Sequence, residues 1–351
     1  NSKLSSLSST RGFTHILESC VFGGTDSAQS CDTGVFGAGG RIIVDRCSFN
    51  NCRIGINASG SYLGSSGWPL DLTVRDSYIK AVEPDSSTAS QGIYSIGSRS
   101  ESRVTIDRCI VKSGNASSVS DHGVIIQQNS DYDVNVWLVA RNSCFVAATG
   151  SSDRAVFLNF DDTTGTIDAR FDDCSFVGGR AGLFTSNAPA SATISARRCT
   201  FSGIDSGVYA NNNASNFGTI ELNECAFYGN VHGIYDTRTI NNANAIVRAV
   251  HCRFLGNNTK AFKDDDSTHV GMAEYCYWGT GGNPPTSGTD SISSGAVDYT
   301  PVLARPYFQT LIGGSPASAA EFDIMESSTV EADALHLITN TPYFAWVFGS
   351  D

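Results

Sequence analysis

The 351-residue chain lacks long apolar runs and has few positive charges. No stretch reaches the length that a membrane-spanning helix needs, so the sequence argues against insertion into a bilayer. Lysine and arginine total 23 against 35 acidic residues, and the net charge of −12 argues against nucleic acid or an anionic membrane surface as a partner. An initiator methionine and a signal peptide are also missing, from which we expect a processed segment of a longer protein.

Segments with a helical apolar period are missing from most of the chain as well, with a possible short helix only at about Ser318 to Met325, whereas glycine, at 35 positions, and other turn-forming residues are abundant. This composition predicts many short strands joined by turns. One motif recurs along the chain: two alternating apolar residues, two polar residues, a small residue, an aromatic or aliphatic residue and then a glycine. The stretch "TIELNECAFYGNVHGIY", which begins at Thr219, is one copy, and "RIIVDRCSFNNCRIGIN", which begins at Arg41, is another.

The small residue of the motif defines the register of the repeat. Its spacing runs from 24 residues (Cys252 to Cys276) to 34 residues (Cys109 to Ser143). Apolar residues stand five and three positions before it and two positions after it. That pattern predicts a first strand, a two-residue polar bend and a second strand, and a third apolar segment follows a glycine or alanine. The ten positions are Cys20, Cys47, Ser77, Cys109, Ser143, Cys174, Cys199, Cys225, Cys252 and Cys276.

Such a repeat predicts an all-β fold, a right-handed single-stranded parallel β-helix of about ten coils. We expect the β-helix over residues 12–304, an N-terminal segment over 1–11 and a C-terminal extension outside the repeat over 305–351. A leucine-rich repeat or a β-propeller fits the period less well. The small residues should point inward as free side chains, because neighbours in a ladder lie roughly 4.8 Å apart, too far for an unstrained disulfide.

Two other cysteines, Cys31 and Cys52, occupy the same place in adjacent coils, three residues before a glycine. Stacked turns allow Cα atoms to lie about 5 Å apart, so we predict a disulfide between them. Cys144 is expected to be unpaired and to face away from its neighbour Ser143. Four N-x-S/T triplets, in what we expect to be surface loops, are candidate glycosylation sites: Asn57, Asn115, Asn213 and Asn257. With the acidic, lysine-poor composition, they predict an extracellular or cell-surface location.

The closing stretch "CYWGTGGNPPTSGTDSISSGAVDYTPVL", Cys276 to Leu303, resembles the last coil of pectate-lyase-like right-handed parallel β-helix proteins. Together with the C-x-F-x-G-N coils, the resemblance covers about residues 12–304. It implies the fold but no single activity, because that superfamily includes lyases, hydrolases, epimerases, phage tailspikes, adhesins and structural proteins. The polygalacturonase motifs N-T-D, G-D-D, G-H-G and R-I-K are absent, as is the R-x-x-R-x-P pattern of pectate lyases.

The polar bends supply candidates for catalysis. Asp172 and Asp173 lie one coil before Arg197 and Arg198, which suggests an acidic-sugar site because glycosidic cleavage needs paired carboxylates. The other interpretation is a solvated column in which the charge of each coil offsets that of its neighbour. Two turn segments could bind Ca²⁺ weakly, and no other cofactor is expected; their carboxylates are Asp161, Asp162, Asp264, Asp265 and Asp266.

Three functions fit these features, and we expect the first: an extracellular non-enzymatic structural module, a subunit of a surface fibre, adhesin or matrix assembly. Its partners would be other copies, end to end, or other surface proteins. The aromatic finish of Phe344, Trp346 and Phe348 favours burial, on its own solenoid or on another subunit. The alternatives are a polysaccharide lyase or glycoside hydrolase, and a carbohydrate-binding solenoid without catalysis. Either would use aromatic side chains near the longer loops: Tyr62, Trp68, Tyr94 and Tyr132.

Overall fold

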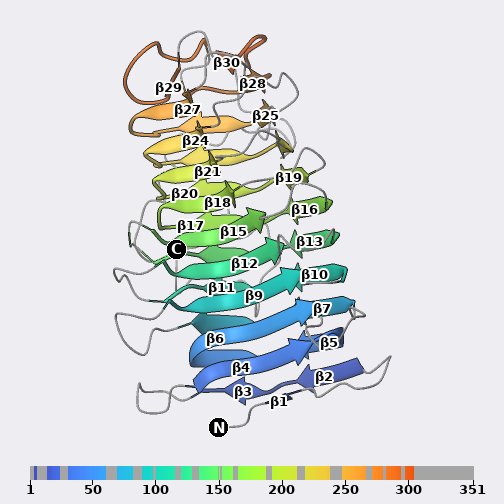
Figure 1. Ribbon diagram of the computed structural model, residues 1–351. Coiled ribbons are helices and arrows are strands. Elements are labelled where there is room, and N and C mark those ends of the chain that lie inside the picture. Colours follow the sequence, from blue (N-terminus) through green and yellow to red (C-terminus); the bar gives the residue numbers. More distant parts are fainter. Residues whose placement is uncertain are drawn as a thin grey trace, which may run out of the picture.

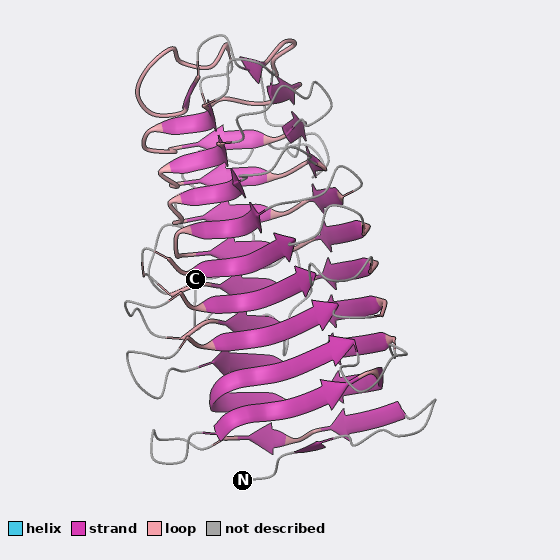
Figure 2. Ribbon diagram, viewed as in Figure 1, coloured by secondary structure: helices cyan, strands magenta, loops and turns pink. Residues whose placement is uncertain are grey.

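Every regular element that the computed structural model describes is a β-strand (Figures 1 and 2). Among the described residues, no helix has the length and hydropathy needed to cross a membrane. The expected extension 305–351 lies outside the described residues, whereas β1 (Leu4–Ser5) within the expected N-terminal segment pairs with the first coil. The structure describes residues 4–5, 14–23, 31–60, 69–81, 89–97, 100–114, 120–128, 134–148, 150, 152–160, 165–186, 192–211, 218–237, 247–265, 271–279, 282–293 and 297–303.

The first strands of the coils form a parallel sheet of eleven strands that follows the chain order. Like positions pair from coil to coil, so that Val104 lies between Leu72 and Leu138. In β7, β10 and β13, for example, buried residues alternate with half-buried or exposed ones, which is the pattern that the sequence predicts. These strands are β2 (Thr14–Glu18), β5 (Gly40–Asp45), β7 (Leu70–Arg75), β10 (Ser102–Asp107), β13 (Val136–Arg141), β16 (Ile167–Asp172), β19 (Thr193–Arg197), β22 (Thr219–Asn223), β25 (Val247–Val250), β28 (Gly271–Glu274) and β30 (Val297–Asp298).

The second and third strands of the coils belong to a second parallel sheet, of nineteen strands. The second strands are β3 (Val21–Phe22), β8 (Tyr78–Ala81), β11 (Ile110–Lys112), β14 (Cys144–Val146), β17 (Ser175–Val177), β20 (Thr200–Ser202), β23 (Ala226–Tyr228) and β26 (Arg253–Leu255). The third strands are β4 (Cys31–Ala38), β9 (Gln91–Gly97), β12 (His122–Gln128), β15 (Arg154–Phe160), β18 (Ala181–Ser186), β21 (Ser206–Asn211), β24 (His232–Asp236), β27 (Lys260–Asp264) and β29 (Ser291–Ile292). In the second coil one strand, β6 (Ser48–Gly60), occupies both places.

The predicted parallel β-helix is therefore confirmed, in the right-handed sense that parallel crossovers favour (Figure 1). Eight coils hold three separate strands each, in the part of the chain that the structure describes. The prediction of about ten coils also counted the second coil, whose strands merge, and the incomplete coil that begins at β28.

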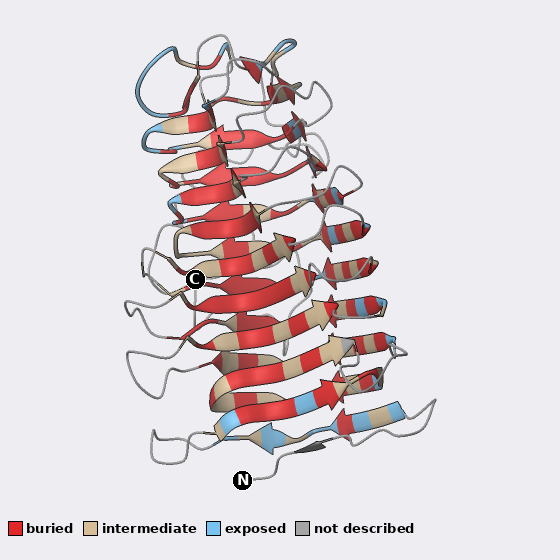
Figure 3. Ribbon diagram, in the orientation of Figure 1, coloured by how far each residue is buried: buried red, intermediate tan, exposed pale blue. Residues whose placement is uncertain are grey.

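Buried residues recur in every complete coil of the ribbon (Figure 3). They form interior ladders of identical or similar side chains. The cysteines at the ladder position are free, and all except the half-buried Cys20 are buried, as the sequence predicts. Cys225 is typical, because its Sγ donates to the carbonyl oxygens of Asn223 (3.4 Å) and Ala196 (3.3 Å). Two residues later, a column of stacked rings runs through five coils with centroid distances of 4.5 to 4.9 Å: Phe176, Phe201, Phe227, Phe254 and Trp278.

A second buried ladder is polar and lies at the turns that precede the third strands. The Nδ2 group of Asn230 donates to Oδ1 of Asn257 (3.0 Å), and Nδ2 of Asn257 donates to Oδ1 of Asp290 (2.7 Å). Backbone amides of Gly256 and Asn257 donate to the same Asp290 carboxylate. These contacts satisfy turn amides that no strand partner reaches, which is why polar side chains are tolerated inside.

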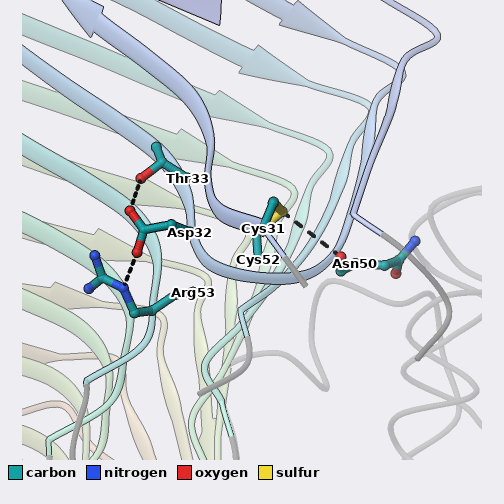
Figure 4. The surroundings of a disulfide bond; sticks show 6 residues. All are labelled: Cys31, Asp32, Thr33, Asn50, Cys52 and Arg53. Atoms are coloured by element: carbon teal, nitrogen blue, oxygen red, sulfur yellow. Dashed lines mark hydrogen bonds and ion pairs between the residues drawn. A yellow bond between two sulfur atoms is a disulfide. The ribbon is translucent and has the colours of Figure 1, made fainter. Parts of the chain in front are cut away.

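The predicted disulfide between Cys31 and Cys52 is present, with Cα atoms 4.6 Å apart (Figure 4). It joins β4 to β6 at paired positions of neighbouring coils. Beside it, Nε of Arg53 donates to Oδ1 of Asp32 at 2.7 Å, so a charged contact and a covalent bond connect the same two coils. The first coil is thereby fixed to the second.

Replacement of a stacked interior ring should cost much more stability than replacement of an exposed one. We expect Phe227→Ala to lower the free energy of unfolding by about 3–5 kcal/mol, because it removes a fully buried ring and leaves a cavity. The control is Phe36→Ala, since that ring is 40% exposed on the outside of β4. Urea denaturation compares the two variants, and equal losses would contradict the stacked column as the source of stability.

Candidate functional site

The polar bends have an unusual backbone conformation, which the sequence analysis does not predict. The second residue of each bend has a positive φ, close to 50°, although none of these residues is glycine. The cost of this conformation is offset by hydrogen bonds between coils, such as Asp173 N–H to the carbonyl of Arg197 (3.0 Å). The residues are Ser19, Arg46, Asp76, Arg108, Asn142, Asp173, Arg198, Glu224, His251 and Tyr275.

The candidate catalytic residues of the bends are bound in ion pairs between coils. Arg198 donates from Nε and Nη2 to the two carboxylate oxygens of Asp173, both at 2.6 Å. Arg197 lies 3.7 Å from the carboxylate of Glu224, and Asp172 lies 3.9 Å from Nε of Arg141. The geometry thus favours the interpretation that the charge of each coil offsets that of its neighbour, because both carboxylate oxygens of Asp173 are bound by Arg198.

The same pairing recurs in earlier coils and shifts the pKa of one carboxyl. Arg108 donates to Asp76 from Nε (2.7 Å) and Nη2 (2.9 Å). These hydrogen bonds hold the pKa of Asp76 below its ordinary value of 3.8 against the opposing effect of burial. Arg75 donates to Asp45 at 3.0 Å in the coil before. The bends form a zipper of opposite charges along one edge of the solenoid.

The carboxylates proposed for Ca²⁺ do not converge where they are described. Asp264 is buried in β27, whereas Asp265 is exposed and accepts a hydrogen bond from the Tyr235 hydroxyl (2.9 Å). Within the described ranges, no three His, Cys, Asp or Glu side chains gather in a way that could hold a metal ion. Asp161, Asp162 and Asp266 lie outside the described residues.

Two of the four candidate glycosylation sites lie within the described residues. Asn57 lies half-buried on the outer side of β6 rather than in a loop. The expectation that Asn257 lies in a surface loop is wrong, because its side chain is fully buried and its Nδ2 donates to Phe227 and Asp290. A glycan could not replace those two hydrogen bonds without breaking the buried ladder. Asn115 and Asn213 lie outside the described residues.

Of the four stacking candidates, Tyr94 alone lies within the described residues, and Tyr62, Trp68 and Tyr132 lie outside them. Tyr94 points outward from β9, and its hydroxyl donates to Oε1 of Gln127 (3.2 Å). Its register partners extend it into a column on the outer side of the third strands, which we call the aromatic column: Tyr94, Ile125, Phe157, Phe184, Tyr209 and Tyr235.

Neighbouring rings of the aromatic column are in contact along most of its length. Phe157 and Phe184 have centroids 5.2 Å apart, and Phe184 and Tyr209 lie 5.0 Å apart, both edge to face. Tyr209 and Tyr235 are stacked at 4.9 Å. The sequence carried the signal for this column, because its residues are the third letters of the recurring triplets "GIY", "AVF", "GLF", "GVY" and "GIY".

Three cations lie against the rings of the aromatic column. Arg154 packs over Phe157 and Phe184, with its Cζ 4.6 and 4.0 Å from the ring centroids. Arg180 lies over Tyr209 at 5.5 Å, and Nζ of Lys263 lies over Tyr235 at 4.0 Å. Such cation–π contacts hold the long side chains along the face.

Arg154 and Arg180 differ from the arginines of the bends in having no carboxylate partner among the described residues. Burial, and after it the charge of Arg180, lower the pKa of Arg154 to about 10 against the opposing effects of Tyr209 and Asp153, so the Arg154 guanidinium remains charged at neutral pH. Nη1 of Arg154 lies 3.4 Å from Nε2 of His122, and burial and this neighbouring charge lower the pKa of His122 to about 3. The imidazole is therefore neutral and accepts the hydrogen bond. Two guanidinium groups therefore lie over the outer rings of an otherwise acidic chain.

A groove of about 380 Å³ lies at the turns that precede the third strands. Glycines with positive φ form much of it, among them Gly179 (φ +79°) and Gly203 (φ +62°), because a side chain in that conformation would be strained. Arg180 directly follows Gly179, so the groove opens beside the positive charge. Its full lining is Gly150, Gly179, Gly203, Ile204, Asp205, Gly229 and Val231.

Comparison of the chain with protein-family models, with curated proteins and with solved structures finds no match. The aromatic column with Arg154 and Arg180 is the best candidate site, because it combines apolar rings with two guanidinium groups that form no ion pair among the described residues.

The ion-pair zipper makes a prediction about Asp76. Its pKa is lowered in the folded state, so the pair with Arg108 contributes stability above pH 3.8, and this contribution disappears as the pH falls through the folded-state pKa. We expect Arg108→Gln to return the pKa of Asp76 toward 3.8, measured by an NMR titration of its carboxyl carbon. Arg170→Gln is the control, because Arg170 pairs with Asp168. An unchanged pKa in the Arg108 variant would refute the assignment.

Proposed function

We propose that the chain is an extracellular, non-enzymatic β-helix module of a surface fibre, adhesin or matrix assembly, and that it binds an acidic polysaccharide along the aromatic column. The unpaired guanidinium groups of Arg154 and Arg180 are the observation that carries the binding role. The disulfide between Cys31 and Cys52 supports the extracellular location, because such bonds persist in oxidising compartments.

The structural part of the proposal is supported by how the coils are joined. Interior rings stack in line, bend charges pair with the next coil and a disulfide connects the first two complete coils. In a solenoid each coil contacts only its neighbours, so such contacts at every step favour a stiff rod. A stiff rod suits a fibre, an adhesin or a matrix subunit.

The polysaccharide is proposed to be acidic because of local charge. The chain carries a net charge of −12, which repels an anionic ligand from most of the surface. Arg154 and Arg180 offer planar donors that match carboxylates, and neither forms an ion pair with a described carboxylate, although Asp153 lies close enough to raise the pKa of Arg154. The half-buried rings of Tyr94, Tyr209 and Tyr235 provide apolar surface beside them. A lyase or hydrolase remains the alternative, with Asp172, Asp173, Arg197 and Arg198 as its candidates.

We also propose that the fold belongs with the pectate-lyase-like β-helix superfamily, on the basis of the closing coil. The Trp of its "CYWG" stretch, Trp278, is buried and stacks on Phe254 with centroids 4.7 Å apart. It therefore ends the interior column of rings with a larger ring. The Val strand that follows is β30, which continues the first-strand sheet.

Binding to polygalacturonate, with neutral dextran as the comparison ligand, tests the function. We expect the double variant Arg154→Gln/Arg180→Gln to bind the acidic polymer at least about tenfold more weakly, because each guanidinium supplies a charge-assisted contact. The matched control is Arg108→Gln/Arg198→Gln, which removes two arginines that are already paired. Affinity is measured by biolayer interferometry at two salt concentrations.

Equal losses in the two double variants, or equal binding of dextran, would refute the acidic-polysaccharide site. Ultraviolet absorbance of the incubated polymer reports on the alternative. An increase from unsaturated uronate, abolished in an Asp173→Asn variant, would establish a lyase and contradict the non-enzymatic proposal.

A further inference from the structure

A second column of outward side chains runs beside the aromatic column. Each of its members stands two residues after a member of the aromatic column, and because side chains alternate along a strand, both columns point outward. β12, β15, β18 and β21 are neighbours in the sheet (Figure 1), and their pairing places these residues in register from coil to coil. We call this set the polar column: Gln127, Asn159, Ser186 and Asn211.

The polar column holds neutral groups that can both donate and accept hydrogen bonds. A carboxamide has two donor hydrogens and an acceptor oxygen, and a hydroxyl group does both with one oxygen. Oδ1 of Asn211 accepts from the Thr237 hydroxyl (3.4 Å), whereas Asn159 and Ser186 make no side-chain hydrogen bond to a described residue. The contacts between described residues therefore leave most of this capacity for a ligand.

The outer rings thus lie between two different kinds of polar side chain. Arg154 begins β15 and Arg180 stands just before β18, so both guanidinium groups reach the rings from the residues that precede them. The polar column follows the rings along the same strands. Charge is therefore confined to one side of the rings, and neutral hydrogen-bonding groups lie on the other.

A uronic-acid ring has the same division. Its carboxyl group stands on one edge of the sugar ring, and two adjacent hydroxyl groups stand on the opposite edge. The C–H groups on the flat side of the sugar can pack on an aromatic ring, while polar groups at the two edges fix its orientation. An acidic polypeptide or a polyphosphate has carboxylates or phosphates without these hydroxyl groups, so it could use only the guanidinium side.

We propose that the polar column binds ring hydroxyl groups of the ligand, on the side of the outer rings opposite to the guanidinium groups. This inference rests on the proposed binding of an acidic polysaccharide. It narrows the ligand from any anionic chain to a uronic-acid polymer whose adjacent hydroxyl groups are unsubstituted. Hydrogen bonds between neutral groups are weaker than charge-assisted ones. The arginines therefore supply most of the affinity, and the polar column supplies the selectivity for a sugar.

Two anionic polymers, with and without hydroxyl groups, test the role of the polar column. In the full-length variant Asn159→Ala/Asn211→Ala, we expect polygalacturonate to bind at least about fivefold more weakly, because two hydrogen bonds to hydroxyl groups are lost. The affinity for polyglutamate, measured in the same way by biolayer interferometry, should stay unchanged. The matched control is Thr193→Ala/Asn223→Ala, which removes exposed polar side chains from β19 and β22 and should change neither affinity.

Acetylation of the polymer gives a readout that needs no variant. We expect polygalacturonate that is acetylated on its ring hydroxyl groups to bind the unaltered chain at least about fivefold more weakly than the free polymer. Equal binding of the two polymers, or equal losses for polygalacturonate and polyglutamate in the asparagine variant, would overturn the hydroxyl-binding role. Binding that depends on Arg154 and Arg180 would still stand in that case. If polygalacturonate does not bind the unaltered chain, the proposed function fails and this inference fails with it.

Discussion

Coil-to-coil register is the constraint on which the rest of the structure depends. In a parallel solenoid every residue stacks on the equivalent residue of the next coil, roughly 4.8 Å away, so each position must be compatible with a copy of itself. Cysteine and phenylalanine satisfy this inside, and asparagine does so by donating from one amide to the next. Charges cannot stack on like charges, so aspartate and arginine exchange places along the bends.

The same constraint explains which parts of the structure could be read from the sequence. Residues that stack in register recur at regular intervals in the sequence. From these intervals the sequence predicts three strands per coil, the inward cysteines and the Cys31–Cys52 disulfide. Asn257 was misjudged because the N-x-T triplet is a local pattern, whereas its burial depends on Asn230 and Asp290 in other coils. The positive φ of the bends was hidden for a similar reason, since bonds between coils stabilise it and no glycine marks it.

The candidate site was less predictable, because two of its arginines lack the ion pairs that the arginines of the bends form. The triplets that predict the third strands also include the aromatic residues of the outer column. Their spacing, however, does not show that Arg154 and Arg180 form no ion pair among the described residues. Pairing is a property of three-dimensional neighbours: Arg198 meets Asp173 in the adjacent coil, whereas Arg154 meets His122 and two rings. Repetition thus identifies the scaffold, and its local exceptions supply the residues of the proposed binding site.

Amide hydrogen exchange at the bends tests the central claim most directly. The amides of Asp76, Arg108 and Asp173 lie on a charged, partly exposed edge, yet each donates to a carbonyl of the next coil at 3.0 to 3.1 Å. If register between coils holds the solenoid together, these amides exchange as slowly as those of the buried strand residue Ile106. Exchange at the rate of an unprotected surface turn would show that the bends are not bonded from coil to coil, and would contradict the account.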